Sequence, residues 1–306
     1  MSSPKEFLEV ARGPETISFV DHQALQTLST INHVSLPSPI VAICHDTLAS
    51  AIGWLQPYPW LSHVVNAAML EDPLAELHMA NLHATLTSNI EPDLLDWVGP
   101  EAEGRRIRLT HASKRAERIE RMGAYLSSNG VSPRACEALR DAAEELLTNA
   151  FYNAPVTAGA TPPISRTNDV ALPEKHACDL AYGYRHDLAV VRVKDPFGSL
   201  SRRRLVEVLS RCARSDMSVQ VDESMGGAGL GMWRIFSAAT FVAISVVKNR
   251  HTEILVGIAK RAAGKRPFAF HFFFTEGAKR RFWKLSADDN NSIGANESVM
   301  LELKSK

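Results

Sequence analysis

Three polar side chains follow one another at intervals of four residues in the segment E-E-L-L-T-N-A-F-Y-N. They are Glu145, Asn149 and Asn153. Residues at this spacing lie on one face of a helix, so the side chains line up. An amide oxygen is a hard ligand that suits Mg²⁺, and a neighbouring carboxylate can take a proton from an attacking hydroxyl or water. We therefore predict Asn149 as a magnesium ligand and Glu145 as a general base. Taken alone, the segment also fits a solvated helix face.

A second candidate is Asp195 in the segment K-D-P-F-G, which follows the apolar run V-V-R-V. A carboxylate at a strand end can accept a hydrogen bond from an adenine amino group. Gly198, which lacks a side chain, would let the backbone approach the base closely. The alternative is an ordinary turn residue, because Asp is frequent before Pro in turns.

A glycine-rich loop forms the third candidate. Gly227, Gly229, Leu230 and Gly231 lead into M-W-R-I-F, which is predicted to be helical. Backbone N–H groups at such a helix start can bind phosphate. The preceding D-E-S-M is no strand, so the loop is not a dinucleotide-binding fingerprint. Residues 215–226 have instead the composition of a lid that could fold over a triphosphate.

Alternating helices and strands must bring these segments together. The pattern predicts a strand at R-I-R-L-T and a helix of about fifteen residues from Ala112. A second helix, opened by Ser132 and Pro133, carries Glu145 and Asn149 and ends before Pro155. A loop over 155–176 and a hairpin turning at 185–187 follow. Beyond them, we expect helices over 201–214 and through Ala239, then strands at 241–247, 253–259 and 268–274. The last of these is either a buried central strand or a surface that a partner covers, and the core position is favoured.

In their order, these segments resemble the N, G1 and G2 boxes of the GHKL ATPases, and most closely those of the bacterial anti-sigma-factor serine kinases. The resemblance covers residues 105–260 and implies a Bergerat fold, an α/β sandwich with a mixed sheet. It implies that Glu145 is the catalytic base and Asn149 the magnesium ligand. Asp195 would read adenine, and Gly227, Gly229 and Gly231 would form the phosphate loop. The G1 segment departs from the usual D-x-G-x-G, and Asn153 stands where related kinases often have His.

The first hundred residues read as a separate module. Residues 36–88 alternate strand, helix, strand and helix, which favours an α/β unit with parallel pairing. The unit loosely resembles a receiver domain, but no acidic pair follows a strand, and Asp46 is better explained as a helix cap than as a phosphoacceptor. We predict a degenerate receiver-like sensor or docking domain over 1–103, then an ATP-binding domain over 104–306, in which residues 261–306 form an extension.

Composition limits the remaining possibilities. Residues 1–100 contain two Lys or Arg and eleven Asp or Glu, a net charge of −9 that the rest of the neutral chain must balance. Four scattered cysteines indicate neither a zinc site nor a disulfide framework. No segment has the length and apolar character of a signal or membrane span, so we expect a cytoplasmic protein. Residues 260–284 are basic and include Phe282 and Trp283, but lack a nucleic-acid-reading motif.

Three functions compete at this stage. The first is a protein kinase that transfers the γ-phosphate of ATP to a Ser or Thr of a regulatory partner, such as a sigma factor, an antagonist or a response regulator. The second is a switch that binds ATP and a partner without chemistry. The third is a sensor histidine kinase, for which His111 would be the phosphoacceptor, but one helix of about fifteen residues cannot supply a long helical hairpin. A homodimer is compatible with all three.

Overall fold

The computed structural model describes residues 17–29, 39–88, 93–99, 101–214, 230–259, 267–276 and 279–280. The strands are β1 Ser18–Val20, β2 Ile40–Cys44, β3 His63–Asn66, β4 Glu103–Leu109, β5 Cys178–Arg185, β6 Leu188–Asp195, β7 Phe241–Val247, β8 His251–Ala259, β9 Ala269–Glu276 and β10 Lys279–Arg280. The α-helices are α2 His22–Ser29, α3 Leu48–Leu55, α4 Ala67–Leu70, α5 Ala75–Thr87, α6 Arg115–Ser128, α7 Pro133–Thr148, α8 Ala154–Thr157, α9 Arg202–Arg214 and α10 Leu230–Ala238. Short helical turns are η1 Leu94–Val98, η2 Ala112–Lys114, η3 Asn149–Asn153 and η4 Glu174–His176.

All the described strands belong to one mixed sheet in the order β1-β2-β3-β9-β7-β8-β6-β5-β4, and β10 pairs with β9. Strands β1, β2 and β3 pair in parallel, as the sequence predicts for the first module. Strand β3 then pairs antiparallel with β9, where His63 lies opposite His271. The mixed α/β class is therefore confirmed. The domain boundary near residue 104 is not, because strands from both sides of it share the sheet.

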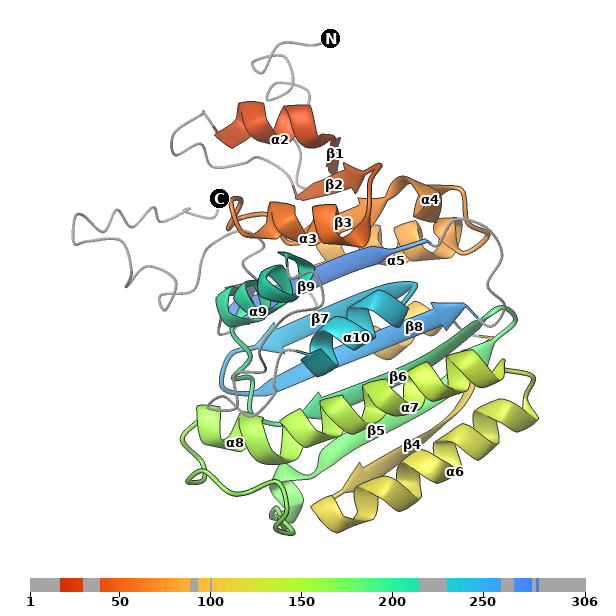
Figure 1. The fold of residues 1–306 in the computed structure, drawn as a ribbon, viewed down its shortest axis with the longest axis vertical. Helices are drawn as coiled ribbons and strands as arrows, with labels where there is room; N and C mark the ends of the chain where they lie inside the picture. The colour runs from red at the N-terminus through yellow and green to blue at the C-terminus, as the bar shows by residue number, and fades with distance from the viewer. Residues whose placement is uncertain are drawn as a thin grey trace, which may run out of the picture.

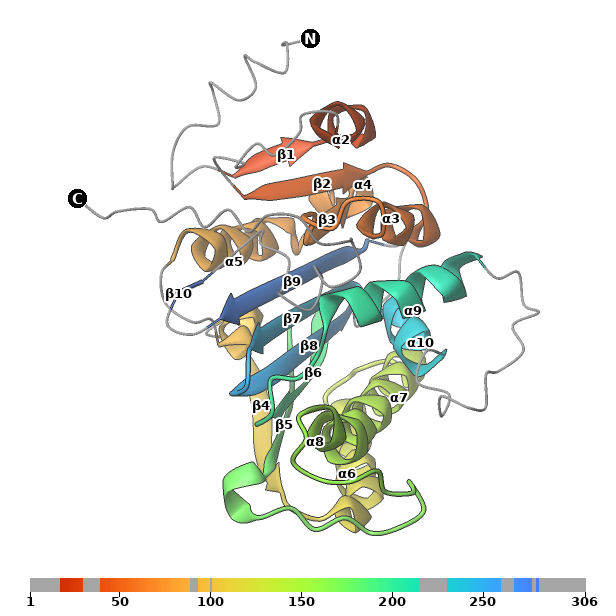
Figure 2. The same ribbon diagram turned by 90° about the vertical axis from the view of Figure 1, so that its left-hand side faces the viewer.

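Helices cover the two faces of the sheet unequally (Figures 1 and 2). Helices α3, α9, α10, α7 and α6 lie on one face, and α5 with η1 lies on the other. On this second face, Leu82 and Trp97 from the first hundred residues pack in one apolar cluster with Phe241, Leu255 and Phe273 from the last third of the chain. Burial of a large apolar side chain stabilises a fold by about 1.5–3 kcal/mol. The N-terminal segment is thus part of the core of the sheet.

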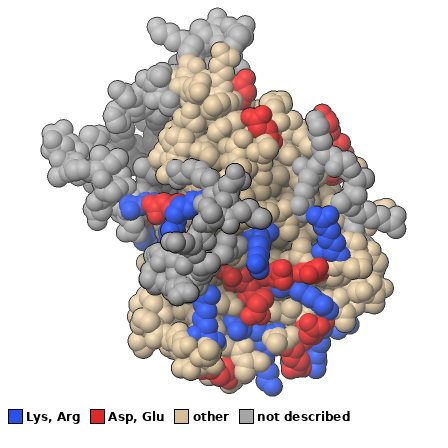
Figure 3. All heavy atoms as spheres, viewed as in Figure 1, with Lys and Arg blue, Asp and Glu red and all other residues tan. Residues whose placement is uncertain are grey.

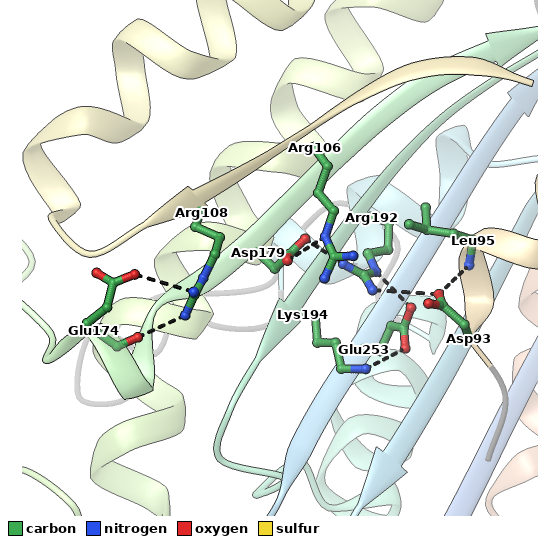
Figure 4. Close-up of polar contacts among 9 residues, drawn as sticks. All are labelled: Asp93, Leu95, Arg106, Arg108, Glu174, Asp179, Arg192, Lys194 and Glu253. Atoms are coloured by element: carbon green, nitrogen blue, oxygen red, sulfur yellow. Dashed lines mark hydrogen bonds and ion pairs between the residues drawn. The ribbon is translucent and has the colours of Figure 1, made fainter.

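A buried charge network fixes η1 on this second face (Figure 4). The guanidinium of Arg192 has no exposed surface; its Nε donates to Glu253 Oε1 over 2.7 Å and its Nη1 to Asp179 Oδ1 over 2.7 Å. The backbone N–H of Leu94 donates to the same Glu253 oxygen over 3.2 Å, and Asp93 lies 3.7 Å from Arg192. These contacts connect the strands β5, β6 and β8 to the segment that covers them.

A second connection joins α9 to the end of α3. Arg202, the first residue of α9, donates through Nη2 to the backbone carbonyls of Leu55, Tyr58 and Leu61. The last carbonyls of a helix have no partner within the helix, so a guanidinium there satisfies them. The first module is therefore anchored on both faces of the sheet.

The predicted elements are largely confirmed, with three corrections. Thr47, not Asp46, caps α3, because the Thr47 side chain accepts from the backbone N–H of Ser50. The helical path does not end before Pro155: a π-helical turn, η3, leads into α8, where Pro155 takes an early position that needs no N–H donor. Strand β8 begins at His251, two residues earlier than predicted. Strand β9, between β3 and β7, is buried and central, as expected.

We predict that Glu253→Ala lowers the free energy of unfolding by about 3 kcal/mol, because it leaves the buried Nε–H of Arg192 and the Leu94 N–H without their acceptor. The measurement is urea unfolding followed by circular dichroism. Glu174→Ala is the matched control, since Glu174 pairs with Arg108 at the surface and both side chains are more than half exposed. It should cost less than about 1 kcal/mol. Equal effects of the two substitutions would contradict a structural role for the network.

Candidate functional site

Helix α7 presents the predicted acid and amide at its C-terminal end. The helix begins where the Ser132 side chain accepts from the Ala135 N–H, with Pro133 in its first turn. Leu139, Leu146 and Leu147 form its buried face, which packs against the sheet. This packing fixes the rotation of α7 about its axis and brings Glu145 to the boundary between the core and the surface.

The three predicted polar side chains form a hydrogen-bonded ladder. Asn149 Nδ2 donates to Glu145 Oε1 over 3.1 Å, and Asn153 Nδ2 donates to Asn149 Oδ1. The ladder crosses the change from α7 to the π-helical turn η3. Single π-helical turns inside α-helices are rare and frequent at functional sites. The oxygen predicted to bind magnesium is thus already hydrogen-bonded within the chain.

Glu145 also meets the start of α10, which carries the last glycine of the glycine-rich loop. A Cβ atom built on Gly231 would lie 2.2 Å from Glu145 Oε2, so only glycine allows this approach. The positive end of a helix dipole favours a carboxylate or a phosphate. Segments more than eighty residues apart therefore come together at one carboxylate. Figure 3 shows acidic side chains flanked by basic ones on the face of the molecule that α7 and α10 cover.

The environment of Glu145 shifts its proton affinity. Burial raises the pKa of Glu145 above its ordinary value, because the charged form is poorly solvated. The hydrogen bond from Asn149 and the positive charges of Arg166 and Arg234 act in the opposite direction without cancelling the rise. A carboxylate with a raised pKa is a stronger base than one at the surface, which suits proton abstraction.

Asp195 ends β6 with its side chain on the same face of the sheet as α7. Only 8% of the residue is exposed, and its Oδ1 accepts from the backbone N–H of Phe197 over 2.9 Å. Burial raises the pKa of Asp195 to about 6, although hydrogen bonds from Phe197 and Gly198 lower it. The carboxyl group thus has the predicted role in a turn, and its burial disfavours its ionised form.

Gly198 has a local structural explanation. Its φ is +60°, and a Cβ atom there would lie 2.1 Å from the backbone oxygen of Val247. The glycine thus allows its loop to pack on the turn between β7 and β8. The next residue connects this loop to the ladder, since Ser199 Oγ donates to the carbonyl of Ala154 over 3.0 Å. The loop after Asp195 is therefore adjacent to the segment that carries Asn153.

Other predicted residues fall outside this cluster. Gly227 and Gly229, with the proposed lid at 215–226, lie outside the described residues, as does most of the 261–306 extension. Leu230 is the first residue of α10. His111 is exposed, precedes η2 and has its Nδ1 2.9 Å from Thr110 Oγ1.

Two arginines were not predicted as part of the site. Arg166 belongs to the loop before β5 and Arg234 to α10, and their charges both act on Glu145. Arg166 lies in a proline-rich segment without periodicity, so the sequence carries no sign of its position. Arg234 could have been suspected, because it follows Gly231 by three residues and so lies near the same helix start.

The donor set suits a magnesium ion that arrives with a nucleotide. Among the described residues, no group of three or more His, Cys, Asp or Glu side chains could hold a metal. Mg²⁺ commonly uses one or two protein oxygens and completes its shell with water and phosphate oxygens. The Asn149 amide oxygen would meet that smaller requirement if it exchanged its hydrogen bond from Asn153 for the metal.

Comparisons with known proteins identify no family for this chain. The sequence matches no protein-family profile and no curated protein. Among solved structures, the chain is similar to a chain from the SiaB-SiaC complex of Pseudomonas aeruginosa, with 17% identity and a TM-score of 0.36, over 50% of this chain and 88% of that one. Within the part of the chain that the structure describes, no helix is both long and apolar enough to cross a bilayer.

We predict that Gly231→Ala destabilises the wild-type protein but not a Glu145→Ala background. The added methyl group must displace the Glu145 carboxylate, whereas in a helix free of such contacts alanine is more stable than glycine by about 1 kcal/mol. A double-mutant cycle, measured by urea unfolding, should give a coupling on the order of 1 kcal/mol. Additive effects would show that the two residues do not touch.

We predict that Asp195→Asn stabilises the protein at pH 8 and has little effect at pH 4. The pKa of Asp195 rises from 3.8 to about 6 on folding. The folded state therefore binds a proton that the unfolded chain lacks, and stability falls as pH rises through this range. Asn resembles the protonated acid and should recover up to about 3 kcal/mol at pH 8. Unfolding at both pH values measures this, and a variant less stable at pH 8 would contradict it.

Proposed function

We propose that this chain is an ATP-binding signalling regulator that transfers the γ-phosphate of ATP to a Ser or Thr of a regulatory partner protein. One observation supports the proposal most: the Glu145 carboxylate lies against Gly231 at the start of α10 while accepting a hydrogen bond from Asn149. An acid can act as the base for phosphoryl transfer from ATP, an amide oxygen can bind its metal ion, and a helix N-terminus can bind its phosphates.

Each residue has a distinct role in this proposal. Glu145 takes the proton of the attacking hydroxyl, and its partly buried position strengthens it as a base. Asn149 would hold Mg²⁺ through its amide oxygen, which would exchange the hydrogen bond from Asn153 for the metal, while the bond from Asn149 Nδ2 to Glu145 orients the amide. The metal, when bound with ATP, neutralises charge on the phosphate oxygens.

The other two segments would bind the adenine and the phosphates of ATP. Asp195 accepts a hydrogen bond from the adenine amino group, and Gly198 sets the turn that follows it. Gly227, Gly229, Leu230 and Gly231 supply backbone N–H groups to the phosphates. The partner would be a sigma factor, an antagonist or a response regulator, and the protein would act in the cytoplasm.

A switch without chemistry is the second candidate, and a specific observation favours it. Asn149 Oδ1 is already engaged by Asn153, and the Asp195 carboxyl is buried and hydrogen-bonded to backbone. Both groups would have to exchange partners when a nucleotide binds. Such an exchange could move a partner-binding surface even if the phosphate were never transferred.

We predict that Glu145→Gln preserves ATP affinity within about threefold but slows phosphoryl transfer by about a hundredfold or more, since only the base is lost. Calorimetry with Mg²⁺ and a non-hydrolysable ATP analogue measures binding, and ATP consumption measures turnover. Asn149→Ala should weaken Mg–ATP binding. Equal ATP consumption by the wild type and Glu145→Gln would reject the kinase and leave the switch. Absence of binding to the wild type would reject both.

A further inference from the structure

Arg115 connects the start of α6 to both ends of the π-helical turn η3. Its Nη1 donates to Thr148 Oγ1 over 2.8 Å, and its guanidinium carbon lies 5.1 Å from the ring centre of Tyr152. Thr148 immediately precedes Asn149, and Tyr152 immediately precedes Asn153. One guanidinium therefore contacts the residue before each of the two amides of the ladder.

The surroundings of Arg115 hold its guanidinium in this place. Its side chain is 16% exposed, and Thr148 and Tyr152 are buried. Arg115 Nη2 lies 3.5 Å from Glu144 Oε1, which also accepts from the Thr148 hydroxyl over 3.3 Å. The Tyr152 hydroxyl donates to the carbonyl of Asn168 over 2.7 Å. Partial burial strengthens both the hydrogen bond and the contact of the cation with the ring.

The geometry of η3 sets how the two amides of the ladder face each other. The N–H of Ala154 donates to the carbonyl of Asn149, five residues back, where an α-helix uses the fourth. Asn153 therefore lies at a different angle about the helix axis from the one it would have in an α-helix, and its bond to Asn149 Oδ1 depends on η3. Such turns are rare, which indicates that contacts from outside the turn stabilise this one.

We infer that Arg115 is a positioning residue, which holds η3 in its π-helical form and thereby orients the Asn149 amide for the magnesium ion. This inference rests on the proposed function and extends it to a residue outside the three predicted segments. Without the guanidinium, the residues before the two amides lose their common contact, and η3 can return to α-helical hydrogen bonding. The Asn149 oxygen would then point in another direction, while nucleotide contacts that do not involve the metal would remain.

The test measures binding of a non-hydrolysable ATP analogue by calorimetry, once with Mg²⁺ and once with EDTA. Arg115→Met keeps an apolar stem on Tyr152 but removes the donors. It should weaken binding about tenfold with Mg²⁺, the loss expected for one hydrogen bond from a charged group, and less than about twofold with EDTA. Thr148→Val removes the acceptor, keeps the side-chain shape and should lower the affinity in the same way. Because the two residues act as a pair, the double variant should lose no more than the weaker-binding single variant.

Arg140→Met is the matched control. Arg140 also joins α7 to α6, because its Nη2 lies 3.2 Å from Glu120 Oε2 and its guanidinium packs over Gly123. It lies more than two helical turns before Asn149, away from η3. Arg140→Met should therefore leave both affinities within about twofold of the wild-type values.

A second measurement needs no nucleotide. Hydrogen exchange of the Ala154 N–H reports the π-helical bond to Asn149 directly. This exchange should be faster in Arg115→Met than in the wild type and unchanged in Arg140→Met. Equal exchange in the wild type and Arg115→Met would show that the guanidinium does not hold η3.

The binding results separate the inference from the proposed function. An equal loss with Mg²⁺ and with EDTA would reject orientation of the metal ligand by Arg115. Unchanged affinities in Arg115→Met and Thr148→Val, with a wild type that gains affinity from Mg²⁺, would reject the role of Arg115 and leave the proposed function intact. A wild type that binds under neither condition, or gains nothing from Mg²⁺, would reject the proposed nucleotide site itself. Thermal unfolding verifies that each variant is folded, and Thr148→Val decides the outcome if Arg115→Met does not fold.

Discussion

The Arg192 guanidinium lies wholly buried between the carboxylates of Glu253 and Asp179, and the position of the candidate site depends on this contact. It ties together three adjacent strands from one face of the sheet. Side chains alternate between faces along a strand, so Asp195, three residues after Arg192, points to the opposite face, toward α7. A shift in strand pairing that broke the charge network would also move Asp195 to the wrong face.

The same network includes residues from the first hundred, so this part of the chain packs as part of the sheet. Leu94 and Asp93 join it directly, and Trp97 and Leu82 belong to the same buried apolar cluster as Leu94. Near this cluster, His78 and His271 lie with their Nε2 atoms 2.9 Å apart. Burial lowers the pKa of His78 to about 3 and lowers that of His271 as well, so both are uncharged at neutral pH.

Two buried carboxyl groups of the candidate site lower the stability of the folded protein. Asp195 is buried, and among the described residues none with a positive charge forms an ion pair with it, which disfavours its ionised form. Glu145 is partly buried beside Glu144, another carboxylate that raises its pKa. Residues that lower stability in this way are typical of sites that bind a ligand or transfer a proton. The proposal of ATP binding gives both costs one explanation.

Most elements could be predicted from the sequence because their signals are local. Ser132 and Pro133 mark the start of α7, the alternating runs around residues 185–187 give the β5–β6 hairpin, and the four-residue spacing aligns Glu145 with Asn149 and Asn153. The helix cap at Thr47 was missed because Asp46 and Thr47 are both good caps and only backbone geometry separates them.

The sequence by itself determined which residues could do chemistry and which helices and strands would carry them, since periodicity and capping act over a few neighbours. Only the tertiary structure decided that Gly231 lies on Glu145 and that β3 pairs with β9 to join the two halves in one sheet. Those contacts connect residues far apart in the chain. They arise from the need to bury both faces of the sheet, which no local pattern records.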